Sequence, residues 1–254
     1  MTIIIFLLVS GFSFGKVNFI EKEIKTAKDI LPIKDSLVVP VLYTKTISLN
    51  HLPVAEKKKK FFEMMLPAVL VAKARLEKTL ERVIAISKKE KLTKSEYDYL
   101  TELYEIYKTT DTEVLIKRLH PFPVSIALAQ AAIESGWGTS RFFLKADNPF
   151  GLWSFDKNEE RIVAKGSRDS KSVYLKKFRN LGESIDAYLK VIATGPYATF
   201  RAQNLKIKDS LKLVKHLHQY SEKREKYVKE LSQIIRSNDL RKYDTYRISP
   251  EYIK

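Results

Sequence analysis

The spacing of apolar residues along the chain predicts a mainly helical protein. From Lys57 onward, apolar side chains recur at helical spacing on a background of Lys and Glu, which is typical of a long amphipathic helix. Pro67 either kinks this helix or restarts it. The apolar positions are Phe61, Phe62, Met65, Leu66, Val69, Leu70, Leu76, Leu80 and Val83.

Shorter helices are predicted further along the chain by apolar spacing and by residues that commonly open helices. The expected ranges are 93–107, 111–119, 124–135, 183–192, 209–219 and 221–237. Their opening residues are Thr93, Asp111, Pro123, Asp209 and Ser221, and Thr93 with Glu96 has the form of a capping box.

Two regions break the helical pattern. Residues 16–56 contain Pro32, Pro40 and Pro53 and no sustained helical period, so we expect an extended N-terminal arm. Residues 148–178 hold short β-prone runs separated by charged turns that contain Gly and Ser, which indicates a small β-hairpin lobe. The predicted fold class is mainly α (α+β).

The segment from Val124 to Ser135 consists almost wholly of Ala, Ile, Leu and Val, and a helix that is apolar on nearly every side is a buried one. Glu134 lies at its end, on the face of Gln130 and Ala131. Burial disfavours an ionised carboxylate, so Glu134 is a candidate general acid that keeps its proton near neutral pH. The alternative is a glutamate that only bonds local backbone.

The sequence that follows Glu134 ends the helix and places an aromatic ring beside it. Gly136 supplies a helix stop and Gly138 a second hinge. Trp137 is thereby held at the edge of the candidate site, where its indole can stack on a ligand ring or pack into the core.

The net charge is +16, from 46 Lys and Arg against 30 Asp and Glu, which favours an acidic partner. Nucleic acid, an anionic lipid surface and peptidoglycan with its carboxylate-bearing stem peptides all fit, and so does a plain Lys-rich solvated surface. The run Lys57 to Lys60 opens a helix without interleaved stacking aromatics, so we do not expect a nucleic-acid partner.

The first fifteen residues carry no charge, contain a short apolar run and end in Ser13-Phe14-Gly15, which predicts a signal peptide over 1–15. We therefore expect an exported protein, periplasmic or associated with the cell wall. Membrane contact is expected only if this segment stays uncleaved as an anchor. We also expect a monomer.

No residue pattern points to a metal or cofactor. The histidines His51, His120, His216 and His218 lack metal-ligand spacing, there is no cysteine, and no Gly-rich phosphate loop or Gly-x-Ser-x-Gly elbow occurs.

A continuous string around Glu134 resembles the signature of a known family. Residues 129–142 read Ala-Gln-Ala-Ala-Ile-Glu-Ser-Gly-Trp-Gly-Thr-Ser-Arg-Phe, and residues 148–153 read Asn-Pro-Phe-Gly-Leu-Trp. Both are similar to the bacterial glucosaminidases of glycoside hydrolase family 73. Further similarities lie at Phe178, Glu183-Ser184, Tyr188, Pro196-Tyr197, Tyr220-Ser221, Tyr227-Val228, Ile234-Ile235, Asn238-Asp239-Leu240 and Tyr243-Asp244. With the Leu66-Pro67 helix, the likeness is greatest to the Bax-type branch and covers residues 57–254.

The resemblance implies a lysozyme-like α lobe, a small β lobe and a groove between them. It also implies hydrolysis of the β-1,4 bond on the reducing side of N-acetylglucosamine in peptidoglycan. The family's catalytic acid falls on Glu134 and its essential tyrosine on Tyr220, which is otherwise a packing tyrosine. The expected substrate-binding residues are Trp137, Asn148, Phe150, Trp153 and Tyr197, although Phe150 and Trp153 also suit the core of the β lobe.

The sequence departs from the family where a second carboxylate is expected late in the β lobe, because Tyr174 occupies that place. Asp156, Glu159, Glu160 and Asp169 are the candidates for this role, or else solvated turn charges. A lytic transglycosylase, a muramidase and a non-catalytic wall-binding or scaffolding protein therefore remain alternatives to the glucosaminidase.

Overall fold

The computed structural model describes residues 17–164 and 173–253, so the expected signal peptide and Asp169 lie outside the described residues. The mainly α prediction is confirmed, with short strands in two-stranded pairs. The α-helices are α1 Val54–Ser87, α2 Lys94–Tyr107, α3 Thr112–Leu119, α4 Val124–Glu134, α5 Arg141–Ala146, α6 Leu181–Thr194, α7 Ala198–Asn204, α8 Ser210–Leu213 and α9 Glu225–Ser237. The strands are β1 Ile20–Glu23, β2 Leu37–Val38, β3 Val41–Thr44, β4 Arg161–Val163, β5 Tyr174–Lys176 and β6 Arg247–Ile248.

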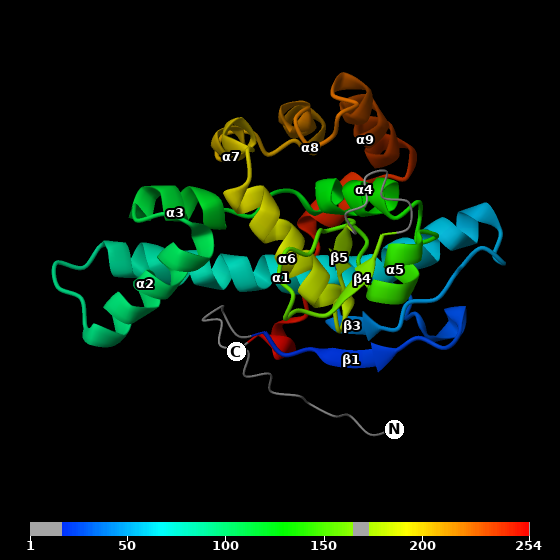
Figure 1. Cartoon of the computed structure of the whole chain (residues 1–254), viewed down its shortest axis with the longest axis horizontal. Helices are drawn as coiled ribbons and strands as arrows, with labels where there is room; N and C mark the ends of the chain where they lie inside the picture. Colours follow the sequence, from blue (N-terminus) through cyan, green and yellow to red (C-terminus); the bar gives the residue numbers. More distant parts are fainter. Residues whose placement is uncertain (1–16, 165–172, 254) are drawn as a thin grey trace.

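Helix α1 runs along the long axis of the molecule and supports the other layers (Figure 1). It contacts α3, α4 and α6, and also β3 and β6. Pro67 lies inside α1 without interrupting it, so the chain continues as one helix through this proline. The residues from Phe61 to Ala72 are buried, so this part of α1 lies in the core.

Several predicted helix starts are confirmed by side-chain caps. Thr93 forms the capping box with Glu96, Asp111 accepts from the amides of Glu113 and Val114, and Asp209 accepts from Lys212. Helices α5 and α7 were not predicted.

The predicted helix start at Ser221 is wrong. Ser221 lies in a turn in which its carbonyl accepts from the amide of Arg224 at 3.0 Å. Arg224 has φ +47°, outside the helical region, so α9 begins only at Glu225.

The N-terminal segment is extended and packs against the helices. β1 pairs in parallel with β3, and β2 pairs in parallel with β6 near the C-terminus. Leu42 and Tyr43 of β3 are buried. A Cβ on Gly182 of α6 would lie 2.7 Å from Cδ1 of Leu42, so a glycine at this position lets α6 approach β3 closely.

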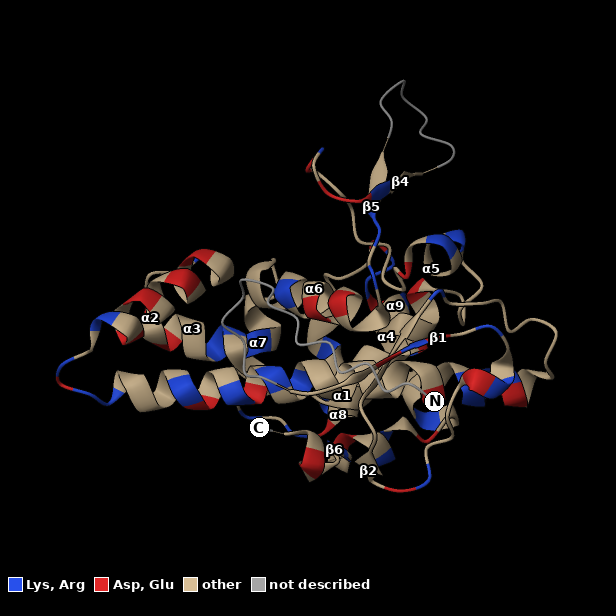
Figure 2. Cartoon of the chain, turned by 90° about the horizontal axis from the view of Figure 1, so that it is seen from below, with Lys and Arg blue, Asp and Glu red and all other residues tan. Residues whose placement is uncertain are grey.

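The β lobe, residues 148–164 and 173–178 as described, contains the antiparallel hairpin of β4 and β5. Figure 2 shows this hairpin standing off from the helical body on the side of α5 and α6. Within the described residues, no helix is long and apolar enough to cross a membrane.

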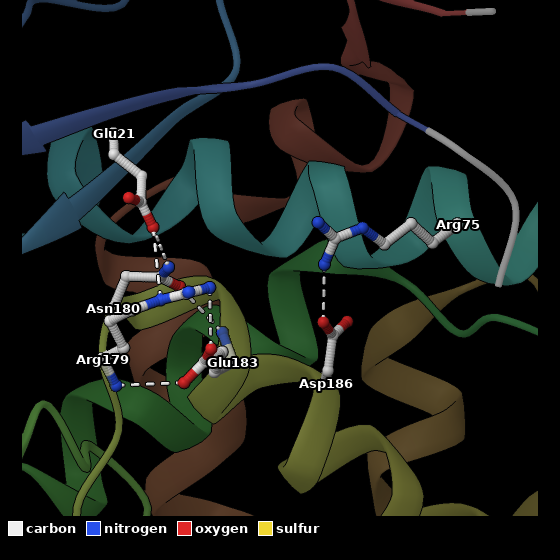
Figure 3. A network of polar contacts seen from close by, with 6 residues as sticks. All are labelled: Glu21, Arg75, Arg179, Asn180, Glu183 and Asp186. Atoms are coloured by element: carbon white, nitrogen blue, oxygen red, sulfur yellow. Dashed lines mark hydrogen bonds and ion pairs between the residues drawn. The ribbon is translucent and has the colours of Figure 1, made fainter. Parts of the chain in front are cut away.

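Polar contacts join α6 to the N-terminal segment and to α1 (Figure 3). Asn180, the N-cap of α6, donates to the carboxylate of Glu21 at 2.6 Å, and Arg179 lies 3.5 Å from the same oxygen of Glu21. Further along α6, Asp186 pairs with Arg75 of α1 at 2.6 Å. These contacts fix α6, which carries Tyr188 into the interior.

Candidate active site

Helix α4 is buried from Val124 to Ala132 and ends at Glu134, as its apolar composition predicts. The end is a Schellman motif in which the amide of Gly136 donates to Ile133 and that of Trp137 donates to Ala132. Gly136 has φ +57°, the left-handed conformation that this motif requires. The half-buried Glu134 thus stands on the last turn of a rigid, buried helix.

The carboxyl group of Glu134 receives a hydrogen bond from α9. The hydroxyl of Tyr227 donates to its Oε1 at 2.8 Å. Burial raises the pKa of Glu134, while the Tyr227 bond and the nearby charge of Lys223 lower it and the charge of Glu230 raises it. The net direction is upward, as required of an acid that keeps its proton at higher pH than an exposed glutamate.

The bond to Glu134 is the end of a buried chain of three hydrogen bonds. Tyr188 donates to Oε1 of Gln130 at 2.5 Å, and Nε2 of Gln130 donates to the Tyr227 hydroxyl at 3.1 Å. Gln130 and Tyr188 are fully buried. The chain links α6, α4 and α9 and holds the Tyr227 hydroxyl on Glu134.

Tyr220, the tyrosine expected to be essential, lies beside this chain. Its ring stacks on Tyr227, with centroids 5.5 Å apart and an interplanar angle of 12°. Tyr197 in turn stacks on Tyr220, with ring centroids 5.8 Å apart. The structure therefore brings Tyr220 and Tyr197 near Glu134, but the direct hydroxyl contact comes from Tyr227.

Trp137 lies between the end of α4 and the start of α1. Its ring meets Phe62 edge-on at 5.5 Å and Phe61 at 6.0 Å, and Nζ of Lys58 lies 4.5 Å from the ring centroid. Its backbone has φ +60°, an uncommon conformation for a bulky residue. The indole is partly exposed, so it combines a packing role with an accessible edge.

Asn148 and Phe150, expected to line a groove, instead have structural positions. Asn148 is fully buried; its amide donates to the carbonyls of Leu152 and Lys176, and its oxygen accepts from the amide of Leu152. Phe150 stacks on Tyr188 at 3.9 Å and 6°. Because these groups are already occupied, Asn148 holds the β lobe together and Phe150 packs against the hydrogen-bond chain.

The exposed aromatic rings of the β lobe are Trp153 and Phe155, 57% and 83% exposed. Ser154 between them is buried, so the two rings share the outer side of this extended segment. Their centroids lie 6.1 Å apart. Trp153 thus has the accessibility that its expected role requires, and Phe155 joins it.

Of the candidates for a second carboxylate, the three that the structure describes have other partners. Glu159 pairs with Lys176 at 2.6 Å and Glu160 with Lys177 at 2.7 Å. Asp156 accepts the amide of Asn158 within its own turn.

A different carboxylate, that of Glu230 on α9, has a charge that acts on Glu134. Glu230 lies one turn beyond Tyr227 and pairs with Lys223 at 3.4 Å. Tyr227 and Glu230, three residues apart, share a face of α9, and this spacing is the sequence signal for the pair, while Lys223 lies in the turn before the helix. Likewise, Gln130 precedes Glu134 by four residues, one helical turn.

A half-buried carboxyl with a hydroxyl donor at the end of a buried helix is the arrangement of a general-acid site. The comparisons assign the family. The model of the Glucosaminidase family, mannosyl-glycoprotein endo-beta-N-acetylglucosaminidase, matches residues 112–240. The chain belongs to this glucosaminidase family.

Among curated proteins, the exo-glucosaminidase LytG of Bacillus subtilis is 29% identical over 140 residues. That match covers 53% of this chain, and it spans 46% of the relative, about half its length. Two solved structures are also similar. The catalytic domain of the autolysin Auto from Listeria monocytogenes has a TM-score of 0.42 and 21% identity, with 65% of this chain and 96% of that one covered. A peptidoglycan hydrolase from Sphingomonas sp. A1 has a TM-score of 0.39 and 18% identity, with 55% and 87% covered.

Proposed function

We propose that this protein is a peptidoglycan hydrolase that cleaves the β-1,4 bond on the reducing side of N-acetylglucosamine, with Glu134 as the general acid. The observation that carries the proposal is the Glu134 carboxyl, half-buried, raised in pKa and bonded to Tyr227, in a chain of the glucosaminidase family. The substrate is a glycan strand of the cell wall, so the protein acts outside the cytoplasm after export.

In this reaction Glu134 gives its proton to the glycosidic oxygen. The electron pair of the bond between that oxygen and the anomeric carbon leaves with the oxygen, and positive charge develops on the sugar ring. Tyr227, which donates to Oε1, stabilises the carboxylate that Glu134 becomes.

Two routes complete the reaction. In an inverting enzyme, a base about 6.5 to 9.5 Å from the acid activates a water molecule. In a substrate-assisted enzyme, the acetamido group attacks the anomeric carbon. Glu159 and Glu160 are each paired with a lysine of the β lobe, so a base for the first route is sought among the other carboxylates, which include Glu230 on α9.

Digestion of purified sacculi followed by mass spectrometry of the fragments tests the proposal. We expect fragments with reducing-end N-acetylglucosamine. Anhydro-muramic ends would instead identify a lytic transglycosylase, and reducing-end muramic acid a muramidase. Sacculi that bind the protein but release no fragments would identify a wall-binding protein.

The variant Glu134→Gln tests the residue. It keeps the size of the side chain and removes the transferable proton, so we expect fragment release to fall by about a hundredfold or more. Glu105→Gln is the matched control, because this glutamate is exposed on α2 and has no expected role in the site. Full activity of Glu134→Gln would refute the role of this glutamate.

A further inference from the structure

The chain that ends on Glu134 has a direction. Each group donates toward the glutamate: Tyr188 to Gln130, Gln130 to Tyr227, and Tyr227 to Glu134. Because the oxygen of Tyr227 accepts from the amide of Gln130, the single hydrogen of that hydroxyl is directed to Oε1 of Glu134. The orientation of the buried Gln130 amide therefore decides whether Glu134 receives the hydroxyl hydrogen of Tyr227.

We propose that Tyr188 and Gln130 are positioning residues that act through Tyr227 to fix which oxygen of Glu134 carries the transferable proton. Oε1 accepts the hydrogen of Tyr227, so a protonated Glu134 carries its own hydrogen on Oε2. A proton confined to one oxygen is presented in one direction, which favours its transfer to a bound glycosidic oxygen. This inference rests on the proposed function.

The Tyr188 hydroxyl selects between the two orientations of the amide. If Gln130 were reversed, its oxygen would take the hydrogen of Tyr227 and leave Glu134 without a donor. Its Nε2 would then donate to Tyr188, whose hydroxyl hydrogen would lose the acceptor it has here. A donor that loses its acceptor in a fully buried site is unfavourable, so the observed orientation is held.

The β lobe contributes to this arrangement. The ring of Phe150 stacks face to face on Tyr188 at 3.9 Å. Phe150 follows Asn148, whose side chain holds Leu152 and Lys176 of the β lobe. The base of the β lobe therefore restrains the first donor of the chain.

Tyr188→Phe removes this donor and keeps the ring. We expect kcat on soluble glycan fragments to fall about tenfold to a hundredfold, the size of effect that misplacing a reacting group produces, with KM within about twofold. The basic limb of the pH profile of kcat/KM should move upward, because the Tyr227 bond lowers the pKa of Glu134 and weakening it removes that effect. Tyr43→Phe is the control, since this buried tyrosine accepts from the amide of Leu31 and belongs to another contact.

Gln130→Glu tests whether the direction of the hydrogen bonds matters. A protonated Glu at this position accepts from Tyr188 and donates to Tyr227, as the amide does, whereas an ionised one accepts from both and takes the hydrogen from Glu134. We expect near wild-type kcat at low pH and a loss of about tenfold or more, relative to wild type, as pH rises. A wild-type profile for Gln130→Glu would overturn the proposal.

The double variant Tyr188→Phe with Tyr227→Phe separates action through Tyr227 from a general structural effect. We expect the same pH limb as in Tyr227→Phe alone, and a further additive shift would overturn the proposal. Titration of the Glu134 carboxyl carbon by NMR compares the pKa of Glu134 among the same variants and needs no activity assay. Absence of glycan cleavage by the wild type would refute the proposed function, while an unshifted NMR titration in Tyr188→Phe would refute this inference alone.

Discussion

The Tyr227 hydroxyl lies 2.8 Å from Oε1 of Glu134, so α9 contacts the last residue of α4 at the carboxyl group. The two elements act on the pKa of this group in opposite directions. Burial at the end of α4 raises it, and the hydrogen bond from α9 lowers it. Because burial is the larger effect, Glu134 holds its proton to a higher pH than an exposed glutamate does. The hydrogen bond from Tyr227 stabilises the carboxylate that forms when the proton leaves.

The Tyr227→Phe variant should lose much of the activity while keeping the fold. Its ring still stacks on Tyr220, but the donor to Glu134 is gone. We expect kcat to fall about tenfold to a hundredfold, because a hydrogen bond to a charged group contributes about 1.5–3 kcal/mol. The measurement is fragment release from sacculi with a thermal melt of each variant, and equal activity of Tyr227→Phe and wild type would contradict it.

Glu134→Gln should change stability in a pH-dependent way. The folded-state pKa of Glu134 is raised, so the protonated group favours folding below its unfolded value, and this contribution is lost as pH rises through the folded value. We therefore expect Glu134→Gln to gain stability relative to wild type as pH increases. Urea unfolding of both proteins at several pH values between 4 and 8 measures this. A free energy of unfolding of Glu134→Gln that falls relative to that of wild type as pH rises would show the opposite shift.

The sequence predicted a buried helix with Glu134 at its end because apolar periodicity is a strong signal. The role of Glu134 as the acid stays a prediction that depends on the family resemblance, because the same pattern also fits a glutamate that only bonds local backbone. The sequence did not predict which tyrosine meets this glutamate. Tyr220 and Tyr227 are seven residues apart, both apolar enough for a core, and the turn at Arg224 between them decides which hydroxyl reaches Glu134. That turn depends on tertiary packing.

Asn148 and Phe150 show a second limit of sequence reasoning. A polar and an aromatic residue beside a candidate site suggest ligand contacts, yet here they hold the protein's own backbone and Tyr188. Burial separates the two roles, and local sequence does not report it. The same holds for residues 17–56, where prolines indicated extended chain but not the pairing of β1 with β3.

Asn148→Ala should loosen the β lobe. It removes three hydrogen bonds and leaves the carbonyls of Leu152 and Lys176 and the amide of Leu152 without these partners. At about 0.5–1.5 kcal/mol for each bond, we expect a loss of about 1.5–4.5 kcal/mol. Denaturant unfolding measures this loss, and hydrogen exchange should show it concentrated in 148–164 and 173–178. A uniform increase in exchange across the described residues would count against a local role.

Thr46→Val should weaken the attachment of the N-terminal segment to α5. The Thr46 hydroxyl donates to the carbonyl of Phe143 at 2.7 Å, and its amide donates to Asp147 at 3.1 Å. Valine keeps the amide bond but removes the hydroxyl in a buried place, so we expect a loss of about 1–3 kcal/mol. Thr110→Val, in an exposed position, is the control for the same substitution, and equal losses in the two variants would argue against this contact.

Trp153→Ala and Phe155→Ala should reduce binding to long glycan strands without lowering stability. Both rings are largely exposed, so their removal creates no cavity in the core. If each stacks on a sugar ring with about 0.5–1.5 kcal/mol, the scale of aromatic pairs, KM should rise roughly twofold to tenfold while kcat stays near wild type. Steady-state kinetics on glycan fragments of increasing length measure this, with Tyr97→Ala on the distant α2, also exposed, as the control. The increase should appear only for fragments long enough to reach the β lobe from Glu134, and an equal increase for the shortest cleavable fragment would place the two rings at the cleaved bond instead.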